Sequence, residues 1–194
     1  MYTHYLIILI QRLGNISAIQ TGIFAKPIGE GEIVYLQAKH FDESGNLISK
    51  LHPDLFFSNV SIKHLLLPGD VIFAAKGLKN FATAYELHNL PAVASTSFFV
   101  IRLQDESVLP RYLAWFMNHP LTQNLLKANA HGTAMASISK AVLQELEISI
   151  PSLRTQEIIL RISELRKNEK QLARQLEDLK EQQIQQNIFK ALKK

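Results

Sequence analysis

The chain has 194 residues, of which 47% are hydrophobic and 20% are charged, a composition typical of one globular domain with an appendage. It contains no cysteine, which excludes disulfide bonds and thiolate metal sites and favours a reducing cytoplasm. The apolar run over residues 6–10 is far shorter than the roughly 20 residues that a membrane span needs, and no signal-peptide pattern surrounds it. We therefore expect a soluble cytoplasmic protein.

The net charge of +4 is unevenly distributed along the chain. Residues 1–151 carry 11 basic and 11 acidic side chains, whereas residues 152–194 carry 10 basic and 6 acidic side chains. Non-specific affinity for DNA comes mainly from the neutralisation of phosphates, so the neutral first part is a poor DNA binder by itself. Any contact with DNA must be local, or must be assisted by a partner.

The first part of the chain shows a strand-rich pattern. Residues 31–41 are rich in β-branched and aromatic side chains and precede the turn-like 42–46, which predicts a strand and a loop. Pro68-Gly69 fits the centre of a type II turn, because proline sets φ and glycine accepts a positive φ. The apolar run 71–75 that follows predicts a buried strand.

A second β run covers residues 92–103, and helical spacing follows over 109–130. His119-Pro120 interrupts that spacing, so we expect two helices with a break between them. The fold class predicted for residues 1–151 is a mixed, strand-rich α+β domain.

Residues 152–194 are different in kind, because neither glycine nor proline interrupts the chain after Leu153. The spacing predicts one long coiled-coil helix, about 60 Å in length, with an apolar seam at the a and d positions of its heptads. Glu169 and Gln183 occupy two a positions, and Ile184, Ile188 and Leu192 continue out of register. The helix needs another helix to cover its seam, and folding back on its own domain is an alternative only for the first turns. The predicted dimer-interface residues are Ile158, Ile162, Leu165, Leu172, Leu176 and Leu179.

No catalytic, metal-binding or cofactor-binding pattern is found. The sequence lacks the glycine-rich phosphate loops, the G-x-S-x-G motif and the H-E-x-x-H motif, and its seven histidines show no ligand spacing. We therefore predict a protein that is not an enzyme and that uses no cofactor or metal.

Polar loops remain as the candidate binding residues. Lysine contacts phosphate or guanine, asparagine pairs with adenine, and small hydroxyl side chains allow close approach to a backbone. The alternative for the lysines is an ordinary hairpin tip that promotes solubility. The predicted DNA-binding residues are Lys76, Lys79, Asn80, Thr96, Ser97, Thr133 and Ser137.

In the segment "HGTAMASISKAVLQELEISIPSL" (131–153), glycine and polar residues precede the pattern I-S-K-x-x-L-x-x-x-x-I-x-x-P-x-L, and a glutamine-containing helix start follows. This pattern resembles a known family, the specificity subunits of type I restriction-modification systems. The segments "LPGDVIFAAKG" (67–77) and "ASTSFFVIRL" (94–103) and the opening "RLGNISAIQTG" (12–22) are also similar to the family. The matching residues of the first segment and of the helix start after it are Ile138, Ser139, Lys140, Leu143, Ile148, Pro151, Leu153 and Gln156.

The resemblance implies a target-recognition domain over 1–151 and a helical spacer and dimerisation arm over 152–194. It also implies double-stranded DNA and a methyltransferase subunit as partners, and in the usual system a translocating nuclease subunit. The usual subunit has two such domains and two helices that pair antiparallel. One of each is present here, which predicts an antiparallel homodimer that reads a bipartite target. The alternative is an adaptor that binds protein instead of DNA, which the neutral charge of 1–151 favours.

Overall fold

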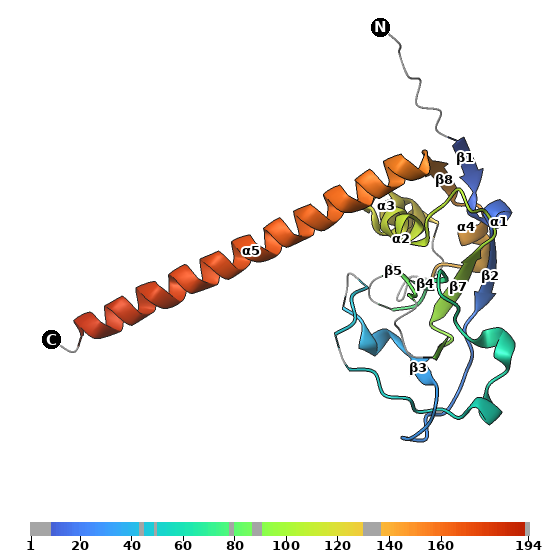
Figure 1. The fold of residues 1–194 in the computed structure, drawn as a ribbon, viewed down its shortest axis with the longest axis horizontal. Helices are drawn as coiled ribbons and strands as arrows, with labels where there is room; N and C mark the ends of the chain where they lie inside the picture. Colours follow the sequence, from blue (N-terminus) through green and yellow to red (C-terminus); the bar gives the residue numbers. More distant parts are fainter. Residues whose placement is uncertain are drawn as a thin grey trace, which may run out of the picture. The chain divides into compact units, whose positions relative to one another are not determined.

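The computed structural model describes residues 9–42, 45–48, 50–77, 80–86, 91–129 and 137–192. The chain separates into two compact units, Met1–Gln156 and Glu157–Lys194. Figure 1 shows strands and short helices in the first unit, and one long helix, α5, that makes up most of the second.

A four-stranded antiparallel sheet with the order β2-β7-β4-β5 lies at the centre of the first unit. Every residue of β4 is buried, because β5 and β7 flank it on either side and the core covers its faces. This explains why β4 has a continuous apolar run instead of an alternating one. The strands are β2 (Ser17–Thr21), β4 (Val71–Ala74), β5 (Ala82–Ala84) and β7 (Phe98–Leu103).

Two small sheets complete the β structure. β3 (Val34–Leu36) pairs in parallel with β6 (Ala92–Ala94), and β1 (Leu9–Arg12) pairs antiparallel with β8 (Glu147–Ile150). The run predicted as a strand over 31–41 is thus a strand of three residues, followed by a 3₁₀ helix.

The β run predicted over 92–103 is also divided, because a turn separates β6 from β7. In this turn the N–H of Phe98 donates to the carbonyl of Ser95 at 2.9 Å. The ring of Phe98 contacts Phe41 and Phe81 in the core, with centroid separations of 5.8 and 6.0 Å.

The turn before β4 has the predicted conformation. The N–H of Asp70 donates to the carbonyl of Leu67 at 2.9 Å, and Gly69 has a φ of 95°, as a type II turn requires. A residue with a side chain is strained at this φ, so the glycine is needed here.

The two helices predicted over 109–130 are confirmed as α2 (Pro110–Asn118) and α3 (Pro120–Ala128). His119 between them is extended, and its Nδ1 accepts from the N–H of Leu121 at 3.3 Å. The remaining helices of the described part of the first unit are α1 (Leu13–Ile16), α4 (Lys140–Gln144) and the 3₁₀ helices η1 (Ala38–His40), η2 (Phe57–Asn59) and η3 (Ile62–His64).

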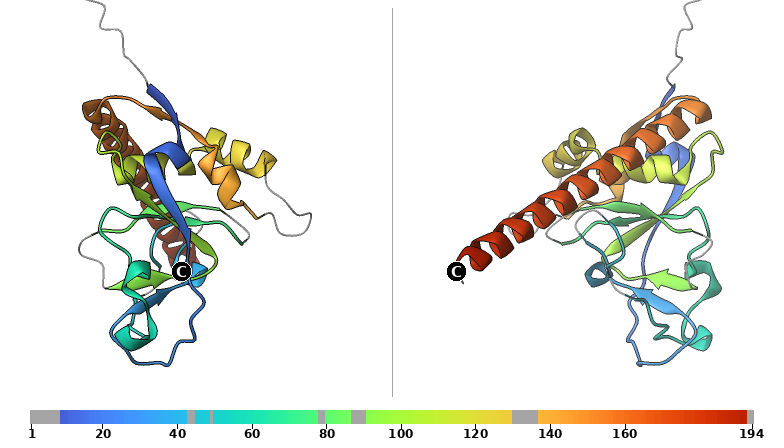
Figure 2. Two further views of the ribbon diagram at one scale, coloured as in Figure 1. Left: turned by 90° about the vertical axis from the view of Figure 1, so that its right-hand side faces the viewer. Right: turned by 60° about the vertical axis from the view of Figure 1, so that its left-hand side comes forward.

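Figures 1 and 2 show the arrangement of the first unit. The helices α2, α3 and α4 lie at one end with β1 and β8, and β3 and the 3₁₀ helices lie at the other end. The central sheet lies between the two ends.

The long helix α5 (Leu153–Ala191) confirms the predicted helical arm, and its 39 residues correspond to about 58 Å. Its first turn belongs to the first unit, where Gln156 is fully buried. The side chain of Gln156 accepts from the N–H of Leu109 at 2.9 Å and donates to the carbonyls of Ser107 and Pro151 at 2.7 and 2.8 Å. These bonds hold the start of α5 to the loop that precedes α2.

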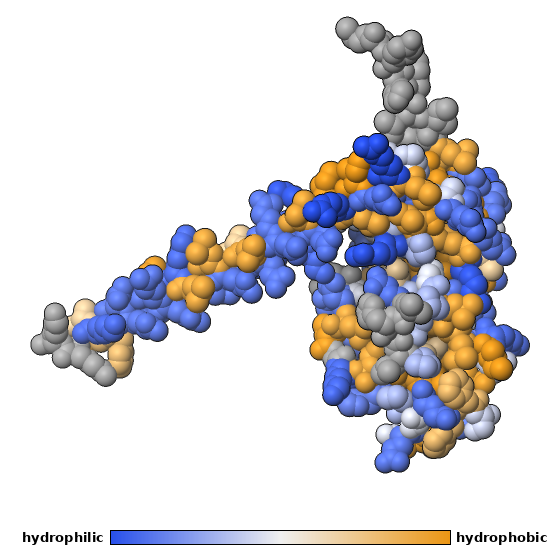
Figure 3. All heavy atoms as spheres, viewed as in Figure 1, coloured by the Kyte–Doolittle hydropathy of each residue, from blue (hydrophilic) through white to orange (hydrophobic). Residues whose placement is uncertain are grey.

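The six seam residues of α5 are exposed in the single chain. Their exposed fractions are 51% for Ile158, 56% for Ile162, 56% for Leu165, 65% for Leu172, 55% for Leu176 and 61% for Leu179. Apolar side chains (orange) interrupt the hydrophilic surface of α5 in Figure 3.

Candidate nucleic-acid interface

Three segments that are distant in sequence meet at Ala75, immediately after β4. The N–H of Ala75 donates to the carbonyl of Ser97 at 2.9 Å, and its carbonyl accepts from the N–H of Ile138 at 3.1 Å. The structure therefore brings together three groups of predicted DNA-binding residues, represented by Lys76, Ser97 and Ser137. The sequence alone did not show that they are neighbours.

Lys76 supplies the positive charge in this cluster. It is exposed, and its backbone N–H also points to the carbonyl of Ser97, at 3.4 Å. Thr96 and Ser97 are half-buried in the turn between β6 and β7, and Ser137 is half-buried beside Ile138. The backbone contacts hold these positions near one another, as a pre-formed binding surface requires. Lys79 and Thr133 lie outside the described residues.

Asn80 has a structural role that the sequence did not reveal. It is only 9% exposed, and its Nδ2 donates to the carbonyl of Ala74 at 2.8 Å. The N–H of Ala74 donates in turn to the carbonyl of Phe81 at 2.8 Å. Asn80 thus ties the end of β4 to the residue before Phe81. Adenine recognition needs the Nδ2 of asparagine as a donor, and in Asn80 this atom already donates to the carbonyl of Ala74. Asn80 therefore contributes to the packing of the domain, while its contact with a base stays a prediction.

Asn118, at the end of α2, is a second positioning residue, and sequence reasoning missed it. Its Oδ1 accepts from the N–H of Ala82 at 2.8 Å, and its Nδ2 donates to the carbonyl of the same residue at 2.7 Å. The side chain therefore pairs with the edge of β5 as another strand would. The available signal was a polar residue in the last helical position before His119-Pro120.

An ion pair between Asp70 and Arg102 joins β7 to the turn before β4. The carboxylate of Asp70 is 1% exposed and accepts from Nε and Nη2 of Arg102, both at 2.7 Å, and from the N–H of Leu67 at 2.8 Å. The hydrogen bond to Asp70 raises the pKa of Arg102, which keeps the guanidinium group charged. The pair stabilises the register of β4 against β7, which places Ala75 beside Ser97.

Gly22 holds the segment after β2 against the same turn. Its N–H donates to the carbonyl of Phe98 at 3.0 Å. A Cβ at this position would lie 2.1 Å from the carbonyl oxygen of Ser95, so glycine alone fits. The match of Thr21-Gly22 to the family opening therefore has a steric reason.

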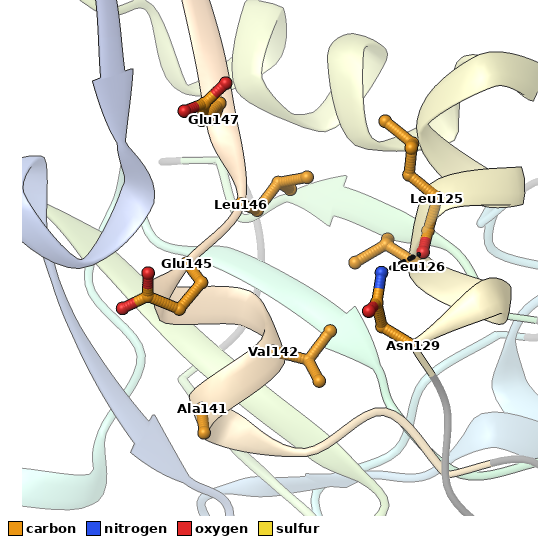
Figure 4. A pocket seen from close by; sticks show the side chains of 8 residues that line it. All are labelled: Leu125, Leu126, Asn129, Ala141, Val142, Glu145, Leu146 and Glu147. Carbon is orange, nitrogen blue, oxygen red and sulfur yellow. Dashed lines mark hydrogen bonds between the residues drawn. The ribbon is translucent and has the colours of Figure 1, made fainter.

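A hollow of about 460 Å³ lies elsewhere, between α3 and the segment from α4 to β8 (Figure 4). The hollow is mainly apolar, because its lining includes Leu125, Leu126, Val142 and Leu146. The carboxylate of Glu145 forms an ion pair with the guanidinium of Arg12, with an N–O distance of 2.9 Å. An apolar hollow with acidic groups is unsuited to a phosphate backbone. It contains none of the predicted DNA-binding residues that the structure describes.

Within the described ranges, no three His, Asp or Glu side chains are arranged to hold a metal ion. None of the helices in this part of the chain is both long and apolar enough to cross a membrane.

The family model of the type I restriction modification DNA specificity domain matches residues 58–186, which is most of the chain. The chain therefore belongs to this family. No curated protein matches it by sequence.

Solved structures share its fold. One is a chain from a study of complex assembly and conformational transition in the type I R-M system, with 20% identity, a TM-score of 0.61 and coverage of 86% of this chain. The S subunit from M. genitalium has 16% identity, a TM-score of 0.57 and 85% coverage. The HsdS subunit from Thermoanaerobacter tengcongensis has 18% identity, a TM-score of 0.56 and 86% coverage. The match spans 39%, 40% and 38% of those three chains, respectively. These likenesses confirm the α+β domain followed by a long helix.

Proposed function

We propose that this chain is the DNA-recognition component of a type I restriction-modification system, and that it directs a partner methyltransferase to a specific sequence. Family membership supports the class of function. The single observation that carries the site is the convergence of Lys76, Ser97 and Ser137 around Ala75. The chain itself supplies recognition and no catalytic step.

In this proposal the cluster at Ala75 faces DNA. The exposed Lys76 contacts a phosphate, and the hydroxyl groups of Thr96, Ser97 and Ser137 bind the backbone or base edges. Lys79 and Thr133, which lie outside the described residues, are proposed as further contacts. Asn80 and Asn118 act as positioning residues through the backbone of the loop and of β5.

The partner subunits supply what this chain lacks. Residues 1–151 have no net charge, so the phosphate contacts that dominate affinity must come largely from the methyltransferase. A translocating nuclease subunit joins the same assembly in a complete system.

We further propose an antiparallel homodimer through the seam of α5, because six exposed apolar side chains at heptad spacing need a second helix. Two identical recognition surfaces then read two half-sites at a defined spacing.

Methylation-state sequencing of host DNA, with and without this gene, tests the proposed function. The expected result is a bipartite methylated motif that disappears with the gene and returns with the intact gene. Complementation with a Lys76→Ala, Ser97→Ala double variant should weaken or alter the motif. An unchanged methylation pattern in the deletion strain contradicts the proposal.

A second candidate is an adaptor that binds a protein and dimerises through α5. The apolar hollow between α3 and β8 and the neutral charge of the domain favour it. Pull-down of the methyltransferase with loss of the methylated motif supports DNA recognition. A stable complex with another protein and no effect on methylation supports the adaptor.

A further inference from the structure

The segment that follows β2 runs beside the turn that carries Thr96. The N–H of Ile23 donates to the carbonyl of Ala94 at 2.8 Å, and Ile23 forms a parallel bridge with Ser95. Because the two segments run in the same direction, the next residue of each, Phe24 and Thr96, leave this bridge side by side. Phe24 is therefore a neighbour of the candidate DNA-binding residues.

The side chain of Phe24 points away from the core behind it. Ile23 and Ala25, on either side of Phe24, both pack against the core cluster that contains Val93 of β6. Side chains alternate along such a segment, so Phe24 points to the opposite face. On β6 the same alternation places Ala94 in the other core cluster, together with the last residue of β4. Phe24 thus lies on the side of β6 that faces the end of β4.

The ring of Phe24 is nevertheless left in water. It is 85% exposed, which is the largest fraction among the leucine, isoleucine and phenylalanine side chains that the structure describes. The backbone that carries it is anchored, because Gly22 donates to the carbonyl of Phe98 at 3.0 Å and packs directly on the carbonyl of Ser95. A ligand that covers this ring gains the free energy of removing apolar area from water.

The charges around the ring favour nucleic acid as that ligand. The segments joined by backbone hydrogen bonds at this place are 22–26, 75–77, 94–97 and 137–140. They contain no Asp or Glu, and their basic residues are Lys26, Lys76 and Lys140, all exposed. The surface is therefore locally basic, although residues 1–151 as a whole have no net charge, and a basic surface suits phosphates.

The chemistry of a phenyl ring limits which part of DNA it can recognise. The ring has no donor or acceptor of an ordinary hydrogen bond, so it cannot read the polar groups on the base edges. In the major groove the apolar group of a base pair is the C5-methyl group of thymine, and phenylalanine is one of the side chains that contact it. The neighbouring lysine and serine side chains cannot supply such a contact.

We infer, on the basis of the proposed function, that Phe24 contacts the C5-methyl group of a thymine in the recognised sequence and is a specificity-determining residue. Lys76 then contacts a phosphate, Thr96 and Ser97 bind the backbone or base edges, and Phe24 selects a T·A pair at one position of each half-site. The recognised half-site accordingly contains at least one A·T pair.

Replacement of thymine by deoxyuridine tests this contact, because deoxyuridine lacks only the C5-methyl group. The affinity of the complex with the methyltransferase is measured on a duplex that contains the methylated motif, with each thymine replaced in turn. For the wild-type chain, replacement at one position should weaken binding roughly fourfold, as the loss of one buried methyl group predicts. In Phe24→Ser the same replacement should have no effect, because the methyl group has already lost its partner.

Phe57→Ser is the matched control. Phe57 is a phenylalanine of η2 that is 45% exposed and lies outside the four basic segments, so this variant should retain the fourfold effect of deoxyuridine. If the effect persists in Phe24→Ser, or is lost equally in Phe57→Ser, Phe24 does not contact the methyl group.

The same measurements distinguish this inference from the proposed function. If a motif depends on the gene but contains no A·T pair, or if no deoxyuridine changes the wild-type affinity, the proposed function stands and the thymine contact is wrong. If Phe24→Ser instead prevents assembly with the methyltransferase, the ring belongs to a protein interface and the thymine contact is again wrong. If methylation does not depend on the gene, both fail.

Discussion

At the scale of single residues, polar side chains near the candidate surface divide into those that face solvent and those that hold the backbone. Lys76 is exposed, whereas Asn80 is buried with its amide on Ala74. Both residue types are found in DNA-reading loops, and only burial and hydrogen bonding distinguish the two roles here. The consequences for mutation differ accordingly.

Lys76→Ala should weaken DNA binding by the complex with its methyltransferase and flatten the salt dependence by about one unit, if the side chain contacts one phosphate. Lys79→Ala is expected to behave in the same way. The measurement is the affinity at several salt concentrations, with Lys63→Ala in η3 as the exposed control. If affinity, salt slope and methylated motif are all unchanged, this loop is not the reading surface.

Asn80→Ala should lower the free energy of unfolding by about 1–2 kcal/mol, because the carbonyl of Ala74 loses its donor in a buried site. Urea denaturation measures this, and Asn124→Ala on the exposed face of α3 is the control. A change in the methylated motif with unchanged stability would instead mean that Asn80 reads a base edge.

The lowered pKa of His40 predicts that the protein loses stability at acid pH. Burial and, to a lesser extent, the charge of Lys39 lower the pKa of His40 below its usual value of about 6.5, and its neutral Nδ1 accepts from the N–H of Gln37 at 3.2 Å. Because the folded-state pKa is lowered, the stabilisation is complete above pH 6.5 and is lost as the pH falls below it. Urea denaturation at pH 7.5 and 5.0 should show a smaller loss in His40→Gln than in the wild type. An equal loss in both proteins would exclude His40 as a source.

At the scale of secondary-structure elements, hydrogen bonds from side chains decide how segments meet. Gln156 holds the first turn of α5 to the loop before α2, and Asn118 joins α2 to β5. The seam residues of α5 are exposed in the single chain. A helix of this length with exposed leucines at heptad spacing is stabilised mainly by a partner helix.

Leu172→Glu should abolish the dimer, because it places a charge in the middle of the apolar seam, where burial stabilises the pair. Analytical ultracentrifugation measures the result, and Gln175→Glu on the same helix is a control for the added charge. Persistence of the dimer in Leu172→Glu would refute this interface.

The orientation of the pair can be tested on the same seam, because the chain has no native cysteine. Under mild oxidation, an Ile158→Cys, Gln183→Cys double variant should form an intermolecular disulfide, and Ile158→Cys alone should not. Efficient cross-linking of the single variant would indicate a parallel pair.

At the scale of the whole molecule, the charge distribution predicts that sequence recognition and DNA affinity reside in different subunits. The excess of basic side chains lies in residues 152–194, and the domain with the candidate surface is neutral. In the proposed function, specificity comes from a small set of pre-positioned groups in this chain, and partner subunits provide most of the phosphate contacts.

The free chain should therefore bind DNA weakly and with little sequence preference, and addition of the methyltransferase should increase both affinity and specificity. Fluorescence anisotropy with a labelled duplex that contains the methylated motif, and with a scrambled duplex, measures this. Tight and specific DNA binding by the free chain would contradict the proposal that partner subunits supply most of the affinity.

The sequence was sufficient to predict those elements that depend on interactions between residues close together in the chain. The turn at Pro68-Gly69, the break at His119-Pro120 and the helix from Leu153 onward depend on backbone preferences and apolar spacing within a few residues. The order of these segments was also sufficient to predict the family. The division of 92–103 into two strands was missed, because a turn of small polar residues does not interrupt an apolar pattern strongly.

Only the tertiary structure decided which segments and side chains are neighbours in the folded domain. The meeting of Lys76, Ser97 and Ser137 at Ala75 depends on hydrogen bonds from Ala75 to Ser97 and Ile138, which are 22 and 63 residues away in sequence, and no local pattern encodes such contacts. The burial of Asn80, the pairing of Asn118 with Ala82 and the contact of Asp70 with Arg102 are decided in the same way. A side chain's type sets which bonds it can form, and the fold sets which partner is within reach.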